Sequence, residues 1–411
     1  MVTGQTYNLL LVLRCFFYFL SRGRVAKKIN GPKKILVAQL AKMGDMVCTT
    51  PMFRAIKNEY PSSKLYVMGD EVNKKLLSSS GDVDGYIVWH KDWRKMVQIL
   101  SYEKFDFAAL TGPSPETLSV LFLSGIPRIV APILEGGYSP LRTKSYAILS
   151  KFVVTKPHRI GRYAPREYLR LLETFGIFTE NTTKHLAFSQ YSEKNVTDFY
   201  IKNGVTLGED FIVGVFPSTG NKIKLWGRDK FAKVADYMID RYKAKVIVFG
   251  SDSDRKEVDE FLSFLKDRSR VIDAAGAFNI DELKALFSKM AILVSVDTGP
   301  IYIAEAFGVG TVDIVGPVDE NDQPPVGGIH KVVVAPRKKP EMGVFNARVY
   351  NKREALRQSE DITPEAVIKE IEDLAMDLDI AQWHDEDGFA PEIGPILVRA
   401  QSWLAKLPRD V

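Results

Sequence analysis

The chain of 411 residues is too long for a single hydrophobic core and suits two or three domains. Its hydrophobic share of 45% and charged share of 26% are those of a soluble globular protein. Its two cysteines, Cys15 and Cys48, exclude a disulfide framework or a zinc-finger pattern and suit a reducing cytosol. The net charge of +5 comes from the N-terminal part of the chain, because residues 1–34 hold seven basic residues and no acidic residue. The rest of the chain holds 49 basic and 51 acidic residues. A nucleic-acid surface over the whole protein is therefore not expected.

The first element in chain order is an apolar segment from Leu9 to Leu20, interrupted only by Arg14. As a helix it would span roughly 18 Å, which is short of the ~30 Å hydrocarbon core of a bilayer. Four adjacent aromatic residues, 16–19, precede a basic cluster made of Arg22, Arg24, Lys27 and Lys28. We expect residues 1–30 to form an amphipathic segment on the anionic inner face of the cytoplasmic membrane. The alternative is a helix that packs on the protein's own domain.

Strands and helices alternate through the first half of the chain. The continuous apolar run at 34–40 is typical of a buried parallel strand, and a helix is expected at 46–58. Further strands are expected at 64–68, 85–89, 105–110 and 127–131, and further helices at 71–79, 92–101, 114–123 and 163–176. The stretch 132–162 is rich in Pro, Gly, Ser and basic residues and is predicted to be a long functional loop.

The same alternation restarts after the polar residues 177–208, which we interpret as a hinge region with one helix. Strands are expected at 211–216, 244–249, 270–273, 291–296, 311–315 and 331–335, and helices at 229–242, 252–265, 280–288 and 299–307. A capped helix from Thr363 to Met376 ends the pattern. Repeated βα units predict two parallel sheets with helices on both faces. Ligands are then expected in a cleft, at the carboxyl ends of the strands.

Three loops that follow strands carry residues capable of chemistry. In the first, Asp45 follows a glycine at the start of a helix, where it either caps the helix or acts as a general base toward a hydroxyl. The second, residues 216–226, carries hydroxyls, an amide and two lysines. These groups suit a phosphate clamp, and the alternative is a solvated basic loop.

The third loop, Asp297-Thr298-Gly299-Pro300, lies between an apolar strand and a helix. Thr298 or Asp297 is expected to cap the helix, Pro300 fits its first turn, and Gly299 lets the backbone approach a ligand. Free N–H groups and the positive end of the helix dipole predict an anion site. An ordinary strand–helix turn is the alternative.

Together the three loops favour transfer of a group from a phosphorylated donor to a hydroxyl. Dinucleotide redox chemistry is disfavoured, because no G-x-G-x-x-G follows the first strand, and there is no Walker A, H-E-x-x-H or G-x-S-x-G motif. The five histidines are scattered without ligand spacing, so no metal site is expected.

The order of these loops resembles that of glycosyltransferase family 9, the ADP-heptose:lipopolysaccharide heptosyltransferase-like enzymes. The matching segments are ILVAQLAKMGDMVCTTPMFRAIKNEYP (35–61), VGVFPSTGNKIKLWGRDKFAKVADYM (213–238) and LVSVDTGPIYIAEAFGVGTVDIVGP (293–317). The resemblance implies a GT-B architecture, an α/β fold of two Rossmann-like parallel-sheet domains facing a cleft. It also implies an inverting, metal-independent glycosyltransferase. The expected divisions are an N-terminal segment 1–30, an acceptor domain 31–190, a nucleotide-sugar domain 208–362, and a C-terminal helix and tail 363–411.

The resemblance also implies roles for single residues. Asp45 corresponds to the general base that deprotonates the acceptor hydroxyl, and Lys224 to the cation that neutralises the leaving diphosphate. The donor-binding residues implied are Ser218, Thr219, Asp297, Thr298, Gly299, Pro300 and Tyr302. Lys42, Arg142 and Lys144 are expected to bind an acidic acceptor, and the alternative for these basic residues is solvated surface. No cofactor is expected, because the nucleotide-sugar donor, ADP-heptose favoured, is a substrate.

One position departs from the family pattern. The family often has histidine two residues after the position of Pro300, where this chain has Tyr302. Tyrosine donates a hydrogen bond but is not a cation near neutral pH, which leaves open whether the donor is ADP-heptose. The expected partners are a nucleotide-sugar, a lipid-linked glycan acceptor such as lipopolysaccharide, and an anionic membrane surface. The alternatives are a GT-B nucleotide-sugar epimerase and a non-catalytic, membrane-associated glycan-binding protein of the same fold.

Overall fold

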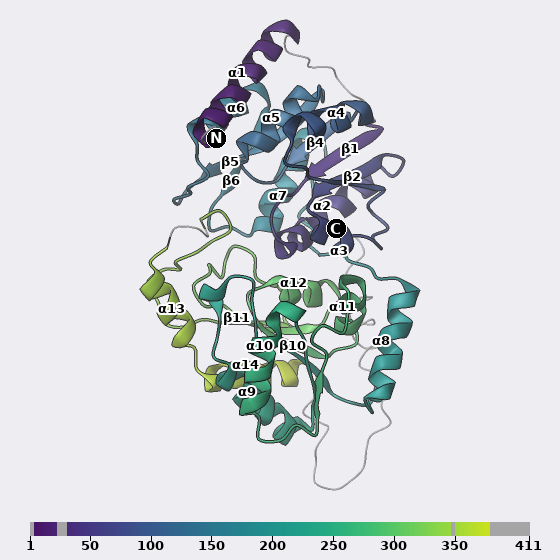
Figure 1. Ribbon diagram of the computed structural model, residues 1–411, viewed down its shortest axis with the longest axis vertical. Coiled ribbons are helices and arrows are strands. Elements are labelled where there is room, and N and C mark those ends of the chain that lie inside the picture. Colours follow the sequence, from purple (N-terminus) through teal and green to yellow (C-terminus); the bar gives the residue numbers. More distant parts are fainter. Residues whose placement is uncertain (1–3, 23–30, 347–349, 379–411) are drawn as a thin grey trace. The chain divides into compact units, whose positions relative to one another are not determined.

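The computed structural model describes residues 4–22, 31–346 and 350–378, and the chain forms two compact units (Figure 1). The first comprises Met1–Ala187 with Asn321–Gln323 and Met342–Tyr350, and the second comprises Phe188–Glu320, Pro324–Glu341 and Asn351–Val411. We call Asn321–Gln323 and Met342–Tyr350 the inserted segments, because they come from the later chain but belong to the first unit. Arg24, Lys27, Lys28 and the tail after residue 378 lie outside the described residues. The domain boundaries expected from the sequence remain predictions.

The first unit is built on a parallel sheet of six strands in the order β3-β2-β1-β4-β5-β6. The strands are β1 (Lys34–Ala38), β2 (Lys64–Gly69), β3 (Gly85–Val88), β4 (Phe107–Leu110), β5 (Arg128–Glu135) and β6 (Val154–Arg159). The helices are α1 (Gly4–Arg22), α2 (Met43–Glu59), α3 (Glu71–Leu76), α4 (Trp93–Glu103), α5 (Pro115–Leu123), α6 (Lys144–Leu149) and α7 (Ala164–Leu172), with 3₁₀ turns η1 (Ser150–Phe152) and η2 (Glu173–Phe175). Side chains of α1, α4, α5 and α6 join those of the strands in one core cluster.

The second unit repeats this plan with a parallel sheet in the order β12-β11-β10-β7-β8-β9. The strands are β7 (Ile212–Phe216), β8 (Lys245–Val248), β9 (Val271–Asp273), β10 (Ile292–Val296), β11 (Gly310–Ile314) and β12 (His330–Val333). The helices are α8 (Gln190–Lys202), α9 (Arg228–Tyr242), α10 (Arg255–Phe264), α11 (Ile280–Phe287), α12 (Gly299–Ala306), α13 (Lys352–Glu360) and α14 (Pro364–Asp377), with η3 (Lys222–Lys224) and η4 (Asp252–Asp254). Two parallel six-stranded sheets with flanking helices confirm the predicted α/β fold class.

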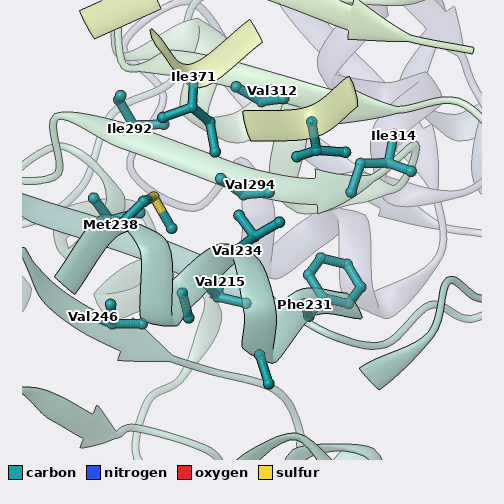
Figure 2. Packing of buried hydrophobic residues seen from close by; sticks show 14 of the residues in the cluster. Val215, Phe231, Val234, Met238, Val246, Ile292, Val294, Val312, Ile314 and Ile371 are labelled. Atoms are coloured by element: carbon teal, nitrogen blue, oxygen red, sulfur yellow. The ribbon is translucent and has the colours of Figure 1, made fainter. Parts of the chain in front are cut away.

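The core of the second unit explains why its strands read as continuous apolar runs. Every residue of β7, β10 and β11 is buried, because helices cover both faces of the sheet. Figure 2 shows Phe231, Val234 and Met238 of α9 facing the strands. These three residues recur at helical spacing, so one stripe of α9 is buried. At the end of the pattern, Thr363 caps α14 as predicted, since its Oγ1 accepts a hydrogen bond from Ala366 N at 3.2 Å.

The prediction of a long loop at residues 132–162 is wrong. The chain there extends β5 to Glu135 and then forms α6, η1 and β6. β6 lies at the edge of its sheet and contains Pro157, and most of its side chains are partly or fully exposed. Proline and polar residues are tolerated on an edge strand, so this strand shows no apolar run in the sequence.

The apolar N-terminal segment forms α1, which packs on α5 and α6 (Figure 1). Its buried side chains are Leu11, Val12 and Cys15, and the rings of Phe19 and Phe152 lie 5.1 Å apart. The other face exposes Leu9, Leu10, Leu13, Phe16, Phe17 and Leu20. One face of α1 therefore packs on the protein's own domain, as the alternative interpretation predicted. The opposite, apolar face of α1 is exposed. None of the described helices has the length and apolar character needed to cross a membrane.

Candidate functional site

A lysine and an aspartate from separate loops meet in the second unit. Asp297 follows the last residue of β10 and is 5% exposed. Lys224 Nζ, at the end of η3, donates to Asp297 Oδ2 at 2.6 Å and to the Asp297 carbonyl oxygen at 2.8 Å. These two contacts use two of the three N–H groups of the ammonium. The pair fixes a cation in the loop region that follows β7 and β10, which are neighbours in the sheet.

Tyr302 lies inside the second unit with only 3% of its surface exposed. Its hydroxyl donates to Asp297 Oδ1, so both carboxylate oxygens of Asp297 accept hydrogen bonds, one from a phenol and one from Lys224. Tyr302 therefore orients the partner of the lysine. This is a task for which a neutral hydrogen-bond donor is sufficient.

The start of α12 carries no side-chain cap within the described chain. Thr298 occupies the N-cap position but makes no side-chain cap hydrogen bond, and Pro300 lies in the first turn as predicted. The expectation that Thr298 or Asp297 caps the helix is therefore wrong, because the Asp297 carboxylate accepts from Lys224 and Tyr302 instead. The positive end of the helix remains available to an anion, next to the Lys224 cation.

The loop after β7 uses its hydroxyls internally. Ser218 is fully buried, and its Oγ donates to Asp254 Oδ1 at 2.6 Å. Burial acts to raise the pKa of Asp254, but hydrogen bonds from Ser218 and Ser251 outweigh it and lower that pKa. Thr219 is also buried, and its Oγ1 accepts from Asn221 N at 3.4 Å. Both residues therefore hold the loop in shape, and their predicted contact with phosphate stays a prediction.

The remaining long side chains of this loop point elsewhere. Lys222 pairs with Glu257 on α10. Trp226 is buried, its ring packs edge-on against Phe231 of α9, and its Nε1 donates to the carbonyl oxygen of Ile362 at 2.9 Å. Trp226 is thus a core residue. Of the two lysines, Lys224 is the one that meets the turn after β10.

Asp313 was missed by the reasoning from sequence. It lies on β11 opposite Ser295 of β10, is 0% exposed, and neither carboxylate oxygen has a hydrogen-bond partner among the described residues. Burial raises its pKa well above the ordinary range, and the nearby charge of Asp297 raises it further, while Lys224 acts in the opposite direction. An acid within an otherwise apolar buried strand is the signal that could have identified it.

In the first unit, Asp45 lies in the first turn of α2, three residues after the N-cap Lys42. It is therefore not the N-cap, which removes one of the two interpretations of this residue. Its Oδ1 accepts a hydrogen bond from Gln323 Nε2 at 2.9 Å, and its carbonyl oxygen accepts from Thr49 Oγ1 at 2.7 Å. Gln39 in turn donates to Thr49 Oγ1 at 2.9 Å, which ties the turn to the end of β1.

A buried aromatic group lies near Asp45. Tyr168 on α7 is fully buried, which raises its pKa, and the charge of Asp45 raises it further. His158 on β6 lies against Tyr168 and against Phe345 of an inserted segment. Burial and the charge of Arg170 lower the pKa of His158 to about 4, so the imidazole is neutral near neutral pH.

The predicted acceptor residues follow strands of the same sheet. Lys42 precedes α2, whereas Arg142 and Lys144 follow β5, and all three are exposed. Arg142 donates to the carbonyl oxygen of Gly136. Arg142 lies in the loop before α6 and Lys144 is the first residue of that helix, and their predicted contact with an acceptor stays a prediction. Among the residues described, no group of three or more His, Cys, Asp or Glu could hold a metal ion.

The model of glycosyltransferase family 9 (heptosyltransferase) matches residues 139–346. The chain belongs to this family. Its members among curated proteins include lipopolysaccharide heptosyltransferase 2 of Escherichia coli (strain K12), which is 25% identical over 357 residues, covering 84% of this chain and 99% of the relative. Lipooligosaccharide heptosyltransferase 2 of Haemophilus influenzae is 23% identical, covering 83% of this chain and 99% of the relative. This family 9 protein is therefore a glycosyltransferase.

Solved structures agree with this family 9 fold. The glycosyltransferase family 9 protein from Veillonella parvula matches with a TM-score of 0.70 and 21% identity, covering 86% of this chain and 99% of that one. The ADP-heptose lps heptosyltransferase II of E. coli matches with a TM-score of 0.65 and 19% identity, covering 84% and 99%. At these identities the likeness establishes the GT-B fold.

Proposed function

We propose that this family 9 protein is an inverting, metal-independent transferase. It moves a sugar, heptose favoured, from a nucleotide-diphosphate donor to a hydroxyl of lipopolysaccharide or another lipid-linked glycan. The observation that carries the proposal is the Lys224–Asp297 pair beside the N-terminus of α12. The names of the relatives, lipopolysaccharide and lipooligosaccharide heptosyltransferases, support the choice of sugar and acceptor.

The proposed chemistry is a single displacement at the anomeric carbon. Asp45 takes the proton of the acceptor hydroxyl, and the acceptor oxygen forms its bond to the anomeric carbon as the bond to the diphosphate oxygen breaks. The electron pair leaves with the diphosphate. Lys224 and the N–H groups at the start of α12 stabilise the charge that develops there. One displacement inverts the configuration at carbon.

The donor residues divide into two groups in this proposal. Lys224, Gly299 and the backbone around Thr298 touch the diphosphate, and Asp297 and Tyr302 hold Lys224 in position through their hydrogen bonds. Because Lys224 has an N–H left after its two contacts with Asp297, it can bind a phosphate oxygen without losing its partner. This arrangement supplies positive charge to the leaving group from the protein itself.

The substitution Asp45→Asn tests the base assignment. It keeps the shape of the side chain but removes its basicity, so transfer should fall by about 10²–10⁴-fold, the range of general-base catalysis. Binding of the nucleoside diphosphate should remain near that of the wild type. Glu59→Gln, an exposed acid at the other end of α2, is the matched control and should leave both quantities unchanged. Full transfer by Asp45→Asn would remove Asp45 as the base.

The proposal includes a place for the protein at the inner face of the cytoplasmic membrane. The exposed apolar side chains of α1 support this, because the largest of them, Phe16 and Phe17, lie on the side of the helix that does not pack on α5 and α6. The sequence next to that face is basic, which suits an anionic lipid surface. A lipid-linked acceptor is found at such a surface.

A further inference from the structure

We propose that Gln323 is a positioning residue for Asp45, delivered to the acceptor half of the enzyme by an inserted segment of the later chain. The inference deepens the proposed function and rests on Asp45 being the base. It is carried by the hydrogen bond from Gln323 Nε2 to Asp45 Oδ1 at 2.9 Å, between residues 278 positions apart in sequence. Asn321–Gln323 belongs to the first unit, although Glu320 and Pro324 on either side belong to the second.

Asp322 fixes this segment within the first unit. It is only 3% exposed, and its Oδ1 accepts from Gly161 N at 3.0 Å while its Oδ2 accepts from Val344 N at 2.8 Å. Its carbonyl oxygen accepts from Ala164 N at 2.6 Å. Three backbone donors therefore hold the residue immediately before Gln323, and hydrogen bonds from N–H groups to a carboxylate are among the stronger ones.

The second inserted segment is anchored in the same way. Ser139 Oγ donates to the carbonyl oxygen of Phe345 at 2.5 Å, and the Phe345 ring lies 4.7 Å from the ring of His158. Val344 joins this segment to Asp322. The backbone that carries Gln323 is thus held by the loop after β6, by the start of α7 and by the other inserted segment.

The chain before Gln323 is braced within the second unit by Arg337. Its guanidinium donates to the carbonyl oxygens of Gly316 and Val318 and pairs with Glu320. The stretch between β11 and Asn321 is therefore held by an arginine that is almost fully buried.

An amide is chemically suited to positioning a base. Its N–H can orient the carboxylate through Oδ1, as the hydrogen bond from Gln323 Nε2 does here. A lysine or arginine at this position would favour the ionised carboxylate so strongly that its basicity would fall, and a carboxylate would repel it. Glutamine donates a hydrogen bond without adding a charge, so it weakens the base less than a cation at this position would.

The titratable groups near this end of α2 gather around Tyr168 on α7. The charges of Asp45, Cys48 and Asp322 act on Tyr168, and the ring of His158 on β6 lies 5.7 Å from that of Tyr168. The raised pKa of Tyr168 keeps its phenol neutral, and the lowered pKa of His158 keeps its imidazole neutral above about pH 4. Replacing Gln323 by an acid would add a new charge next to Asp45.

The test compares Gln323→Glu and Gln323→Met with the wild type, measuring transfer as a function of pH. In Gln323→Glu the added carboxylate disfavours the ionised form of Asp45, so the acidic limb of kcat/KM should move up by about one pH unit or more. In Gln323→Met the donor is lost at similar size, and kcat should fall about tenfold, the effect of losing one hydrogen bond to a charged group. The KM for the donor should stay unchanged in both variants.

Gln98→Glu, an exposed substitution on α4, adds the same charge to the same unit and should leave the pH profile unchanged. Calorimetric titration with ADP, or with whichever of GDP, UDP and CDP stabilises the wild type, checks that each variant folds and binds. If Gln323→Glu does not fold, the kcat of Gln323→Met alone tests the role of Gln323, and a wild-type kcat would overturn that role. Wild-type kcat and a wild-type acidic limb in the Gln323 variants, with Asp45→Asn inactive, would overturn the role of Gln323 alone. Full activity of Asp45→Asn would overturn the proposed function itself.

Discussion

Replacing Asp313 by asparagine should stabilise the protein near neutral pH. Both oxygens of this carboxyl are buried without a hydrogen-bond partner among the described residues, and burial together with the charge of Asp297 raises its pKa well above the ordinary 3.8. The folded protein therefore holds Asp313 protonated at a pH where the unfolded chain has released the proton. Folding must take up that proton, which costs free energy. Asparagine has nearly the same shape and does not titrate.

The sign and the slope follow from proton linkage. Stability is full below the ordinary pKa of 3.8 and is lost as pH rises toward the folded pKa, because the native state binds one more proton than the unfolded state. Between these two pKa values the free energy of unfolding of the wild type should fall, relative to Asp313→Asn, by about 1.4 kcal/mol per pH unit. The advantage of the variant stops growing once Asp313 ionises in the folded state.

Urea unfolding of the two proteins at pH 5, 6, 7 and 8 measures this difference from the shift in midpoint. Asp198→Asn, the same substitution at an exposed carboxylate on α8, is the matched control. That control should leave the pH dependence of the free energy of unfolding unchanged. A stability difference between Asp313→Asn and the wild type that does not change from pH 5 to pH 8 would show that Asp313 is ionised in the fold and would refute the reasoning.

The other predictions concern the leaving group and the membrane. Lys224→Ala should weaken donor affinity and lower kcat together, whereas Lys256→Ala, an exposed lysine on α10, should change neither; unchanged kinetics in Lys224→Ala would remove this residue from the site. The triple variant Phe16→Ser, Phe17→Ser, Leu20→Ser should no longer bind vesicles that contain anionic lipid. The control Tyr191→Ser, which replaces an exposed aromatic residue on α8, should still bind them. Equal vesicle binding by the triple variant and the wild type would contradict a membrane role for α1.

The strands and turns that position the site were predictable because their signals are local. β10 consists of five buried residues, four of them apolar, and the turn that follows is marked by Gly299 and Pro300. The same reasoning failed for β6, whose polar edge-strand sequence has no apolar run. It also failed for α13, since this helix lies beyond the part of the second half whose alternation is clear.

The contacts within the site were not predictable in the same way, because they join distant parts of the chain. Lys224 and Asp297 are 73 residues apart and meet only because β7 and β10 are neighbours in the sheet. The hydrogen bond between Tyr302 and Asp297 depends on how the first turn of α12 directs one side chain. Gln323 gave no signal at all, since a glutamine in a polar stretch resembles any loop residue. Its placement against Asp45 depends on the folding of the inserted segments.

The central claim is that the second unit binds the diphosphate of a nucleotide-sugar through Lys224 and the start of α12. The most direct test is a thermal-shift comparison of the wild type and Lys224→Ala with ADP-, GDP-, UDP- and CDP-linked sugars, using the free nucleoside diphosphates as controls. We expect one nucleotide class to stabilise the wild type, by about 2.7 kcal/mol at 100 times its Kd, and to stabilise Lys224→Ala much less. No shift with any donor, or equal shifts in both proteins, would contradict the claim.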